Sequence, residues 1–429
     1  MIPMKKNLLA LLASVFVFHV PAGGAERPNV ILIISDDQGF PDYGFMGNKA
    51  VSTPNLDRMA SEGLLYTRGY VMPVCSPSLA TLLTGKLPHE HGITGNDLAG
   101  DRKAREPLAK RLLGNSLTLP KALTEAGYLT FQTGKLWNVT FKEVGFTYGM
   151  TDTAGRHGDA GLKIGREGMK LIYDFIETAK AEKKPFFIWH APLLPHDPHT
   201  PPERIFKKYK GKGPTNKAEK YFAMVEWFDE TCGELDAYLE KERLKENTVI
   251  LYLADNGWDA ERGYDGNRAK LSPFELGIRT PMFVRWPGKV KPLRDDETLA
   301  SILDFAPTIL GITGAKNPGD LPGLDLTNHP SMMARKSVFV EGYHHDIADL
   351  GAPEKSLTAR VVVDGWWKLI VPGPNNPTRP FAGVPDGVSL FDLKTDLLEK
   401  SNVAADHPDV VERLQGLLKE QWDVKVLLQ

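Results

Sequence analysis

The run Asn29-Val30-Ile31-Leu32-Ile33-Ile34, followed by Ser35-Asp36-Asp37, decides the fold of this chain. Its continuous aliphatic side chains are typical of a strand buried on both faces, as in the middle of a parallel sheet. Apolar strands then alternate with amphipathic helices, which predicts an α/β fold with a mostly parallel sheet between helices. Strands are expected at residues 128–133, 186–189, 248–253 and 282–286, and helices at 54–62, 119–126, 169–176 and 225–239.

The chain changes character after about residue 335. Short strand candidates are separated there by loops, at residues 337–341, 358–363, 366–371 and 388–393. Asp364-Gly365 predicts a tight turn and therefore a hairpin, and residues 409–422 predict a closing amphipathic helix. We expect a main domain over residues 26–335 and a C-terminal α+β subdomain over 336–429, a small antiparallel sheet with one helix.

The first 25 residues have the pattern of an export signal. Lys5 and Lys6 precede an apolar run over residues 8–20, and small residues follow up to Ala25. This run is shorter than the roughly 18 residues that a membrane span requires. We therefore predict a signal peptide over residues 1–25 and an exported protein, periplasmic or secreted, without stable membrane insertion.

Charge and cysteine content exclude other classes of protein. The formal net charge of -2 gives no electrostatic reason to expect nucleic acid as a partner. Two cysteines in an exported chain do not make a disulfide framework. Cys232 falls on the apolar face of the helix predicted over 225–239 and is expected to be buried, whereas Cys75 needs a different explanation.

Oxygen-bearing side chains follow two of the predicted strands. Asp36-Asp37 end the first strand, and Asp255-Asn256 follow the strand at 248–253. Ligands of open α/β sheets bind beyond the carboxyl ends of the strands, and this set suits Ca²⁺ or Mg²⁺. Each pair alone could merely cap a helix or turn, but two pairs at equivalent places favour a metal site.

Three cationic or imidazole side chains lie at similar positions. Lys135 follows the strand at 128–133, His196 follows the strand at 186–189, and Lys270 lies in a charged loop after Asn256. Taken singly, each would be interpreted as a solvated surface residue rather than a catalytic one. Together with a divalent metal they describe a pocket for a tetrahedral anion such as sulfate or phosphate.

The segment Cys75-Ser76-Pro77-Ser78-Leu79, with Thr84-Gly85 after it, resembles the sulfatase signature C-x-P-x-R followed by T-G. The resemblance covers nearly all of the chain after residue 26, in the family's order. It extends to the opening strand with its acidic pair, the second acidic strand end, the lysine loop and the C-terminal subdomain: residues 27–37, 253–257, 270–281, 366–369 and 390–393.

This resemblance implies an alkaline-phosphatase-like fold and a sulfuric ester hydrolase whose catalytic domain spans residues 26–335. It implies that a formylglycine-generating enzyme oxidises Cys75 to formylglycine, whose hydrate attacks sulfur with one hydroxyl and eliminates sulfate with the other. The substrate would be a sulfated small molecule or glycan, and we expect a sulfated carbohydrate. One Ca²⁺ would be held by Asp36, Asp37, Asp255, Asn256 and the modified Cys75, while Lys135, His196 and Lys270 would bind sulfate and assist the leaving oxygen.

The chain departs from the family pattern at two places. The signature arginine is replaced by Leu79, and a histidine that often follows the active-site lysine is replaced by Trp137 and Asn138. Arg156 and His157 are candidate replacements for the missing cation and base, although such a loop is more often a simple turn. The aromatic side chains Trp137, Trp258 and Tyr264 could stack on sugar rings or serve only in packing.

Two alternatives stay open from the sequence. A phosphomonoesterase or phosphodiesterase on the same fold would bind its tetrahedral anion in a similar pocket. Such relatives, however, usually carry two metals with additional ligands. A degenerate sulfatase that binds sulfated glycans without cleaving them is suggested by Leu79 and Trp137.

Overall fold

The computed structural model describes residues 27–98, 117–136, 139–152, 163–262, 268–374 and 383–424. Several features predicted above lie outside these residues: the signal peptide at 1–25, Trp137, Asn138, Arg156, His157 and Tyr264. Within the described ranges, none of the helices has both the length and the apolar character needed to cross a membrane.

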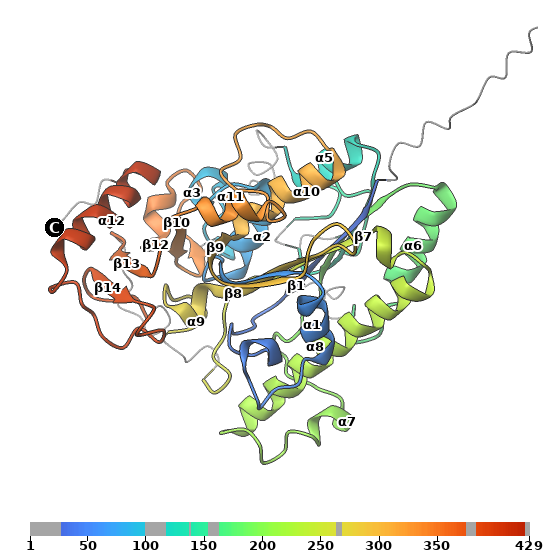
Figure 1. Ribbon diagram of the computed structural model, residues 1–429, viewed down its shortest axis with the longest axis horizontal. Helices are drawn as coiled ribbons and strands as arrows, with labels where there is room; N and C mark the ends of the chain where they lie inside the picture. The colour runs from blue at the N-terminus through green and yellow to red at the C-terminus, as the bar shows by residue number, and fades with distance from the viewer. Residues whose placement is uncertain are drawn as a thin grey trace, which may run out of the picture.

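An eight-stranded sheet forms the centre of the molecule (Figure 1), in the order β5-β4-β6-β1-β7-β8-β2-β9. Its strands are β1 (Asn29–Ser35), β2 (Leu64–Tyr70), β4 (Leu129–Gly134), β5 (Tyr148–Gly149), β6 (Phe186–Ala191), β7 (Thr248–Ala254), β8 (Arg279–Arg285) and β9 (Leu293–Ser301). Only β8 among them runs antiparallel to its neighbours, β7 and β2. The mostly parallel sheet is confirmed.

Strand β1 is buried on both faces, as its apolar run predicts. Val30, Leu32 and Ile34 enter one core, while Ile31 and Ile33 enter the other. Helices cover both faces of the sheet (Figure 1): α2 (Cys75–Thr84), α5 (Leu119–Glu125) and α10 (Phe305–Thr313) on one, and α1 (Pro54–Ser61), α6 (Lys170–Glu182) and α8 (Asn216–Lys241) on the other. Each large aliphatic side chain buried in this way contributes about 1.5–3 kcal/mol.

Helix α1 begins where the sequence predicts, and its amino-end amides are bound by a side chain from a distant helix. Thr53 occupies the N-cap position without capping, because its hydroxyl donates to Asp57 Oδ1 instead (2.8 Å). The free amides of Asn55 and Leu56 donate to the carboxylate of Asp229 on α8, at 3.1 and 2.7 Å. A long-range contact thus replaces the local cap.

Three strands of the sheet are absent from the sequence prediction: β2, the two-residue β5, and β9. In β2 the apolar run is interrupted by Arg68, which is buried and donates to Glu297 O at 2.8 Å. In β9 the first five residues, 293–297, are polar or exposed, and only the second half is buried. Neither segment has the apolar pattern by which strands are recognised.

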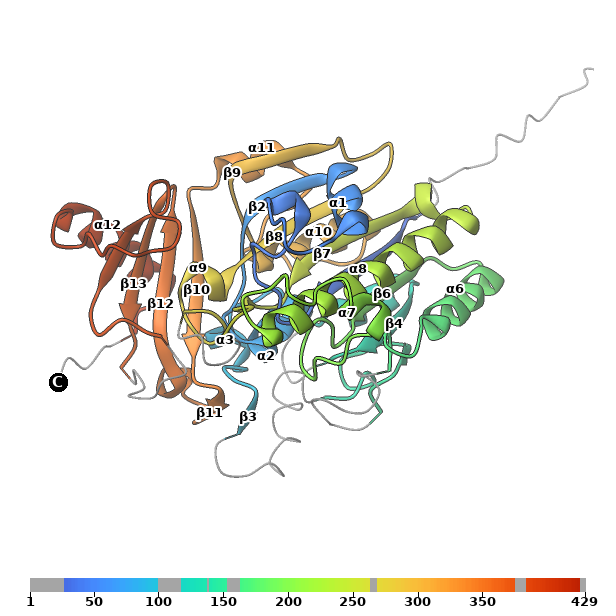
Figure 2. The same ribbon diagram turned by 90° about the horizontal axis from the view of Figure 1, so that it is seen from below.

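The C-terminal subdomain is an antiparallel sheet in the order β10-β12-β13-β14 (Figure 2). Its elements are β10 (Ser337–Tyr343), β12 (Leu357–Asp364), β13 (Trp367–Pro372), β14 (Ser389–Asp392) and the covering helix α12 (Pro408–Gln421). The predicted hairpin is confirmed, since Asp364 pairs with Trp367 and Gly365 has a φ of 57°. Val338 and Val340 enter the same core as β1, so the two sheets are packed together.

Candidate active site

The carboxyl ends of β4, β6, β1 and β7 lie side by side, because these four strands are parallel neighbours. The backbone pairing continues past the strand ends, with Asp36 N donating to Leu194 O (3.0 Å) and Asp255 N donating to Ser35 O (2.9 Å). The structure therefore gathers the predicted site residues at this edge: Asp36, Asp37, Lys135, His196, Asp255, Asn256 and, from neighbouring loops, Cys75 and Lys270.

Asp37 is the centre of one half of the cluster. Its Oδ1 accepts hydrogen bonds from Lys270 Nζ (2.5 Å) and Asn256 Nδ2 (2.8 Å). His196 Nε2 lies 3.5 Å from its Oδ2. The backbone φ of Asp37 is 60°, which is in the left-handed region, where a non-glycine residue is strained. Such strain concentrates at functional sites, because it persists only where the surroundings enforce it.

Lys135 is the centre of the other half. Its ammonium group lies 2.6 Å from Asp36 Oδ1 and 3.4 Å from Asp255 Oδ2. Gly134, just before it, has a φ of 72°, and a Cβ there would meet Ala191 O at 2.0 Å. A glycine is needed at this point, because the backbone of β4 closely approaches β6 where it delivers Lys135 to the site.

The carboxylates of the cluster have divergent proton affinities. Burial would raise the pKa of Asp37, but the charges of Lys270 and His196 hold that pKa well below its usual value. Burial, helped by the negative charge of Asp36, raises the pKa of Asp255 to about 8. Three carboxylates this close repel one another, and a divalent cation would relieve the repulsion.

The donor set fits such a cation. Three buried oxygens, Asp36 Oδ2, Asp37 Oδ2 and Asn256 Oδ1, accept no hydrogen bond from the described part of the chain. Leaving buried oxygens without partners is costly, so they indicate a missing ligand. Carboxylate and amide oxygens are the donors that Ca²⁺ and Mg²⁺ prefer.

Cys75 is the first residue of α2 and is fully buried. The charge of Asp36 keeps the pKa of Lys135 high against the effect of burial, and Cys75 lies close enough to Lys135 to act in the same direction. Its Sγ lies 3.3 Å from Asn96 Oδ1. The other cysteine, Cys232, is unbonded and buried on α8, as predicted.

Two side chains discussed in the sequence prove to be packing residues. Leu79 is 1% exposed and belongs to the apolar core on the α2 face of the sheet, so it offers the site no polar group. Trp258 is also 1% exposed and packs on Tyr221, with ring centroids 6.3 Å apart. The interpretation of Trp258 as a packing residue is therefore the one that the structure supports.

The structure adds two residues that sequence reasoning missed. Asn96 contacts Cys75, and Arg166 donates to the backbone oxygens of Leu193 (2.6 Å) and His196 (3.0 Å). Arg166 thereby fixes the loop that carries the imidazole. No local pattern marks either residue, because each acts through a contact with a distant segment.

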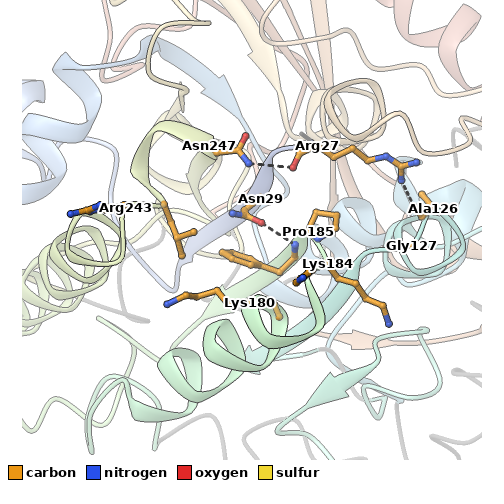
Figure 3. A pocket seen from close by; sticks show the side chains of 13 residues that line it. Arg27, Asn29, Ala126, Gly127, Lys180, Lys184, Pro185, Arg243 and Asn247 are labelled. Carbon is orange, nitrogen blue, oxygen red and sulfur yellow. Dashed lines mark hydrogen bonds between the residues drawn. The ribbon is translucent and has the colours of Figure 1, made fainter. Parts of the chain in front are cut away.

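A cavity of about 780 Å³ lies at the opposite, amino-terminal end of the strands (Figure 3). It is lined by Asn29 of β1 and by several cations, among them Lys180, Lys183 and Arg243. These three lie at or just beyond the carboxyl ends of α6 and α8, where basic side chains offset the helix dipole. None of the predicted site residues lines this cavity.

Comparisons with known proteins agree with the geometry. The family model described as "Sulfatase" matches residues 28–315, and that described as "N-sulphoglucosamine sulphohydrolase, C-terminal" matches residues 267–424. The chain belongs to the sulfatase family. As a sulfatase it is an enzyme that hydrolyses sulfate esters, on the alkaline-phosphatase-like fold that the sequence predicts.

The relatives of this sulfatase extend over most of its length. N-acetylgalactosamine-6-sulfatase of Canis lupus familiaris is 30% identical over 360 residues, which cover 73% of this chain and 67% of that protein. Arylsulfatase A of Homo sapiens is 28% identical, covering 75% and 69% respectively. The crystal structure of Ps i-CgsB in complex with k-i-k-neocarrahexaose is similar in fold, with a TM-score of 0.74, 22% identity, and coverage of 93% of this chain and 94% of that one.

Proposed function

We propose that this sulfatase releases sulfate from a sulfated carbohydrate, using a formylglycine made from Cys75 and one Ca²⁺ held by Asp36, Asp37, Asp255 and Asn256. One observation carries the proposal. Three carboxylates and two lysines converge in a buried cluster around the start of α2, with three oxygens left without hydrogen-bond partners.

Each part of the cluster has a chemical role. When it is bound, the cation supplies Lewis-acid polarisation of the sulfate group. Lys135 and Lys270 neutralise charge on the sulfate oxygens, and they are effective because they are almost completely buried. Modified Cys75 would supply the nucleophile: one hydroxyl of its hydrate would bond to sulfur as the ester S–O bond breaks, and loss of a proton from the other would expel sulfate and restore the aldehyde.

His196 is placed to protonate the departing alcohol oxygen. Its Nδ1 lies 2.7 Å from Asp197 O, so Nδ1 must carry a proton and donate a hydrogen bond to this carbonyl. Nε2 faces the carboxylates, and when both ring nitrogens are protonated it is the nitrogen that can give its proton to the leaving oxygen. Burial lowers the pKa of His196, and Asp36 and Asp37 oppose this effect.

The names of the related proteins support a carbohydrate substrate. One relative is an N-acetylgalactosamine-6-sulfatase, and a protein of similar fold has been crystallised with a neocarrahexaose. The proposal includes export from the cytoplasm and maturation by a formylglycine-generating enzyme.

The test is a sulfate-release assay on sulfated mono-, di- and polysaccharides, run beside the corresponding phosphate esters. Wild-type protein should release sulfate from at least one carbohydrate class, and Cys75→Ala should release none. The tryptic peptide that spans Cys75 should have the mass of formylglycine. Turnover of phosphate esters alone would establish the phosphoesterase alternative, and glycan binding without release would establish a degenerate binding protein.

A further inference from the structure

Asn96 has a polar side chain that contacts Cys75. Its Oδ1 lies 3.3 Å from Cys75 Sγ and accepts a second hydrogen bond from Ser76 N at 3.2 Å. It is completely buried. Oxidation of Cys75 and hydration of the resulting aldehyde would replace the sulfur by two hydroxyl oxygens on the same Cβ. The S–H group therefore represents one of these hydroxyl donors.

The hydrogen bonds fix which way the Asn96 amide points. A backbone N–H can only donate, so the atom that faces Ser76 must be the amide oxygen. The amide nitrogen therefore faces His345 Nε2, 3.0 Å away, and must donate to it. His345 Nε2 is then an acceptor, and its Nδ1 carries the proton that is donated to Asp346 Oδ1 at 2.6 Å. The contacts form one directed chain from Asp346 through His345 and Asn96 to residue 75.

We infer that Asn96 orients the reactive side chain at position 75, and that His345 is a positioning residue that holds Asn96 in this orientation. The inference rests on the proposed function. Leu79 packs in the apolar core, so the signature position contributes no hydrogen bond to residue 75. The Asn96 oxygen supplies an acceptor for one hydroxyl of the hydrate, which limits the rotation of that group about the Cα–Cβ bond.

The backbone supports the same assignment. Asn96 N donates to His345 O at 2.6 Å, and the short strands β3 (Asp97–Leu98) and β11 (Asp346–Ile347) pair in parallel directly after these two residues. Figure 2 shows the two strands together at one edge of the molecule, where the C-terminal subdomain meets the main sheet. The C-terminal subdomain therefore contributes to the geometry at residue 75, although it supplies none of the predicted metal ligands.

Asn96 could also act only by stabilising α2, because its side-chain oxygen accepts a hydrogen bond from Ser76 N in the first turn of that helix. The experiment must distinguish this structural role from the positioning of residue 75. Asn328 offers a matched control, since its Oδ1 accepts from Ser331 N (3.3 Å) at the start of α11 (His329–Ala334), remote from the site. Asn328→Ala should cost stability without changing turnover. Melting temperature and the formylglycine content of residue 75 are measured for every variant.

Kinetics give the first readout. In Asn96→Ala, kcat should fall by about 10²-fold with little change in KM, the size of effect expected when a reacting group loses its alignment. His345→Ala should show a smaller fall in kcat, and His345→Gln should recover part of it, because its side-chain oxygen can accept from the Asn96 amide. The double variant Asn96→Ala/His345→Ala should be no slower than Asn96→Ala, since His345 acts through Asn96. Unchanged kcat in Asn96→Ala, or additive effects in the double variant, would overturn the inference.

A readout without substrate separates this inference from the proposed function. The hydrate can donate a hydrogen bond to Asn96 Oδ1 and the free aldehyde cannot, so Asn96 favours the hydrate. A hydrazide probe should therefore label residue 75 faster in Asn96→Ala than in wild type. Faster labelling supports the inference even if wild-type protein releases no sulfate, an outcome that would refute only the proposed function. Equal labelling rates would refute the inference that Asn96 accepts a hydrogen bond from the hydrate.

Discussion

At the scale of single residues, the site depends on charges that are buried and therefore strong. Lys135 and Lys270 are each 2% exposed, and each lies within 2.6 Å of a carboxylate oxygen. In such surroundings an ammonium group is little screened by water, so it can stabilise charge that develops on a sulfate oxygen. The same group placed on the surface would have a small effect.

Replacing Lys135 by alanine should lower kcat/KM by on the order of 10²–10³, as for loss of one preorganised donor. The measurement is sulfate release under conditions that saturate the metal site. Lys170→Ala is the matched control, because Lys170 is 83% exposed and pairs with Asp174 on the surface. Similar losses in both variants would contradict a catalytic role for Lys135.

At the scale of elements, α3 (Pro88–His91) is joined to β10 by a partly buried ion pair. His89 Nδ1 lies 2.5 Å from Glu341 Oε1, and its ring stacks on Trp422 with centroids 4.5 Å apart. Burial would lower the pKa of His89, but the hydrogen bond and charge of Glu341 raise it overall. Glu90 acts in the same direction, while Tyr343 donates to the other oxygen of Glu341.

This ion pair should make stability depend on pH. Because folding raises the pKa of His89, its contribution is complete below the unfolded value of about 6.5 and is lost as pH rises through the folded value. The difference in unfolding free energy between wild type and His89→Gln should therefore be largest at acidic pH and should narrow as pH rises. Urea denaturation across this range measures it.

The control for this prediction is His407→Gln. The ring of His407 packs on Trp367, with ring centroids 4.9 Å apart. A comparable narrowing in this control would mean that the effect does not come from the contact of His89 with Glu341. A His89→Gln difference that stays constant with pH would mean that folding leaves the pKa of His89 unchanged, which would contradict the prediction.

At the scale of the whole molecule, the proposed metal site would join distant parts of the chain. Asp36-Asp37 follow β1 and Asp255-Asn256 follow β7, so a bound cation would cross-link two central strands. A ligand that binds only the folded state stabilises it in proportion to the logarithm of its concentration over its dissociation constant.

Chelation should therefore lower the melting temperature and abolish sulfate release, and Ca²⁺ should restore both. Asp36→Asn/Asp37→Asn protein should show no increase in melting temperature on adding Ca²⁺. Full activity in metal-stripped wild-type protein would contradict the assignment of these ligands.

The two sheets should unfold together. Val338 and Val361 of the C-terminal sheet lie in the same apolar core as Val30 and Leu32 of β1, so neither part buries its apolar surface alone. Calorimetry should give one cooperative transition, with equal calorimetric and van't Hoff enthalpies. Two separated transitions would show that the subdomain is independently stable.

The amino-acid sequence by itself determined the central strands, the helices between them and the polar ends that meet at one edge. These features follow from local rules: a buried strand needs an unbroken apolar run, and parallel neighbours place their carboxyl ends together. Asp36, Asp37, Asp255 and Asn256 could be predicted as a group for this reason, and the family signature added Cys75.

Only the tertiary structure decided the remainder. Strand β9 has a largely polar first half, and β8 runs antiparallel, which no local period reveals. Asn96 meets Cys75 from 21 residues away and His345 from 249 residues away. The physical reason is the same throughout. Sequence periodicity indicates which face of an element is buried, whereas these contacts depend on how separate elements pack against one another in the folded protein.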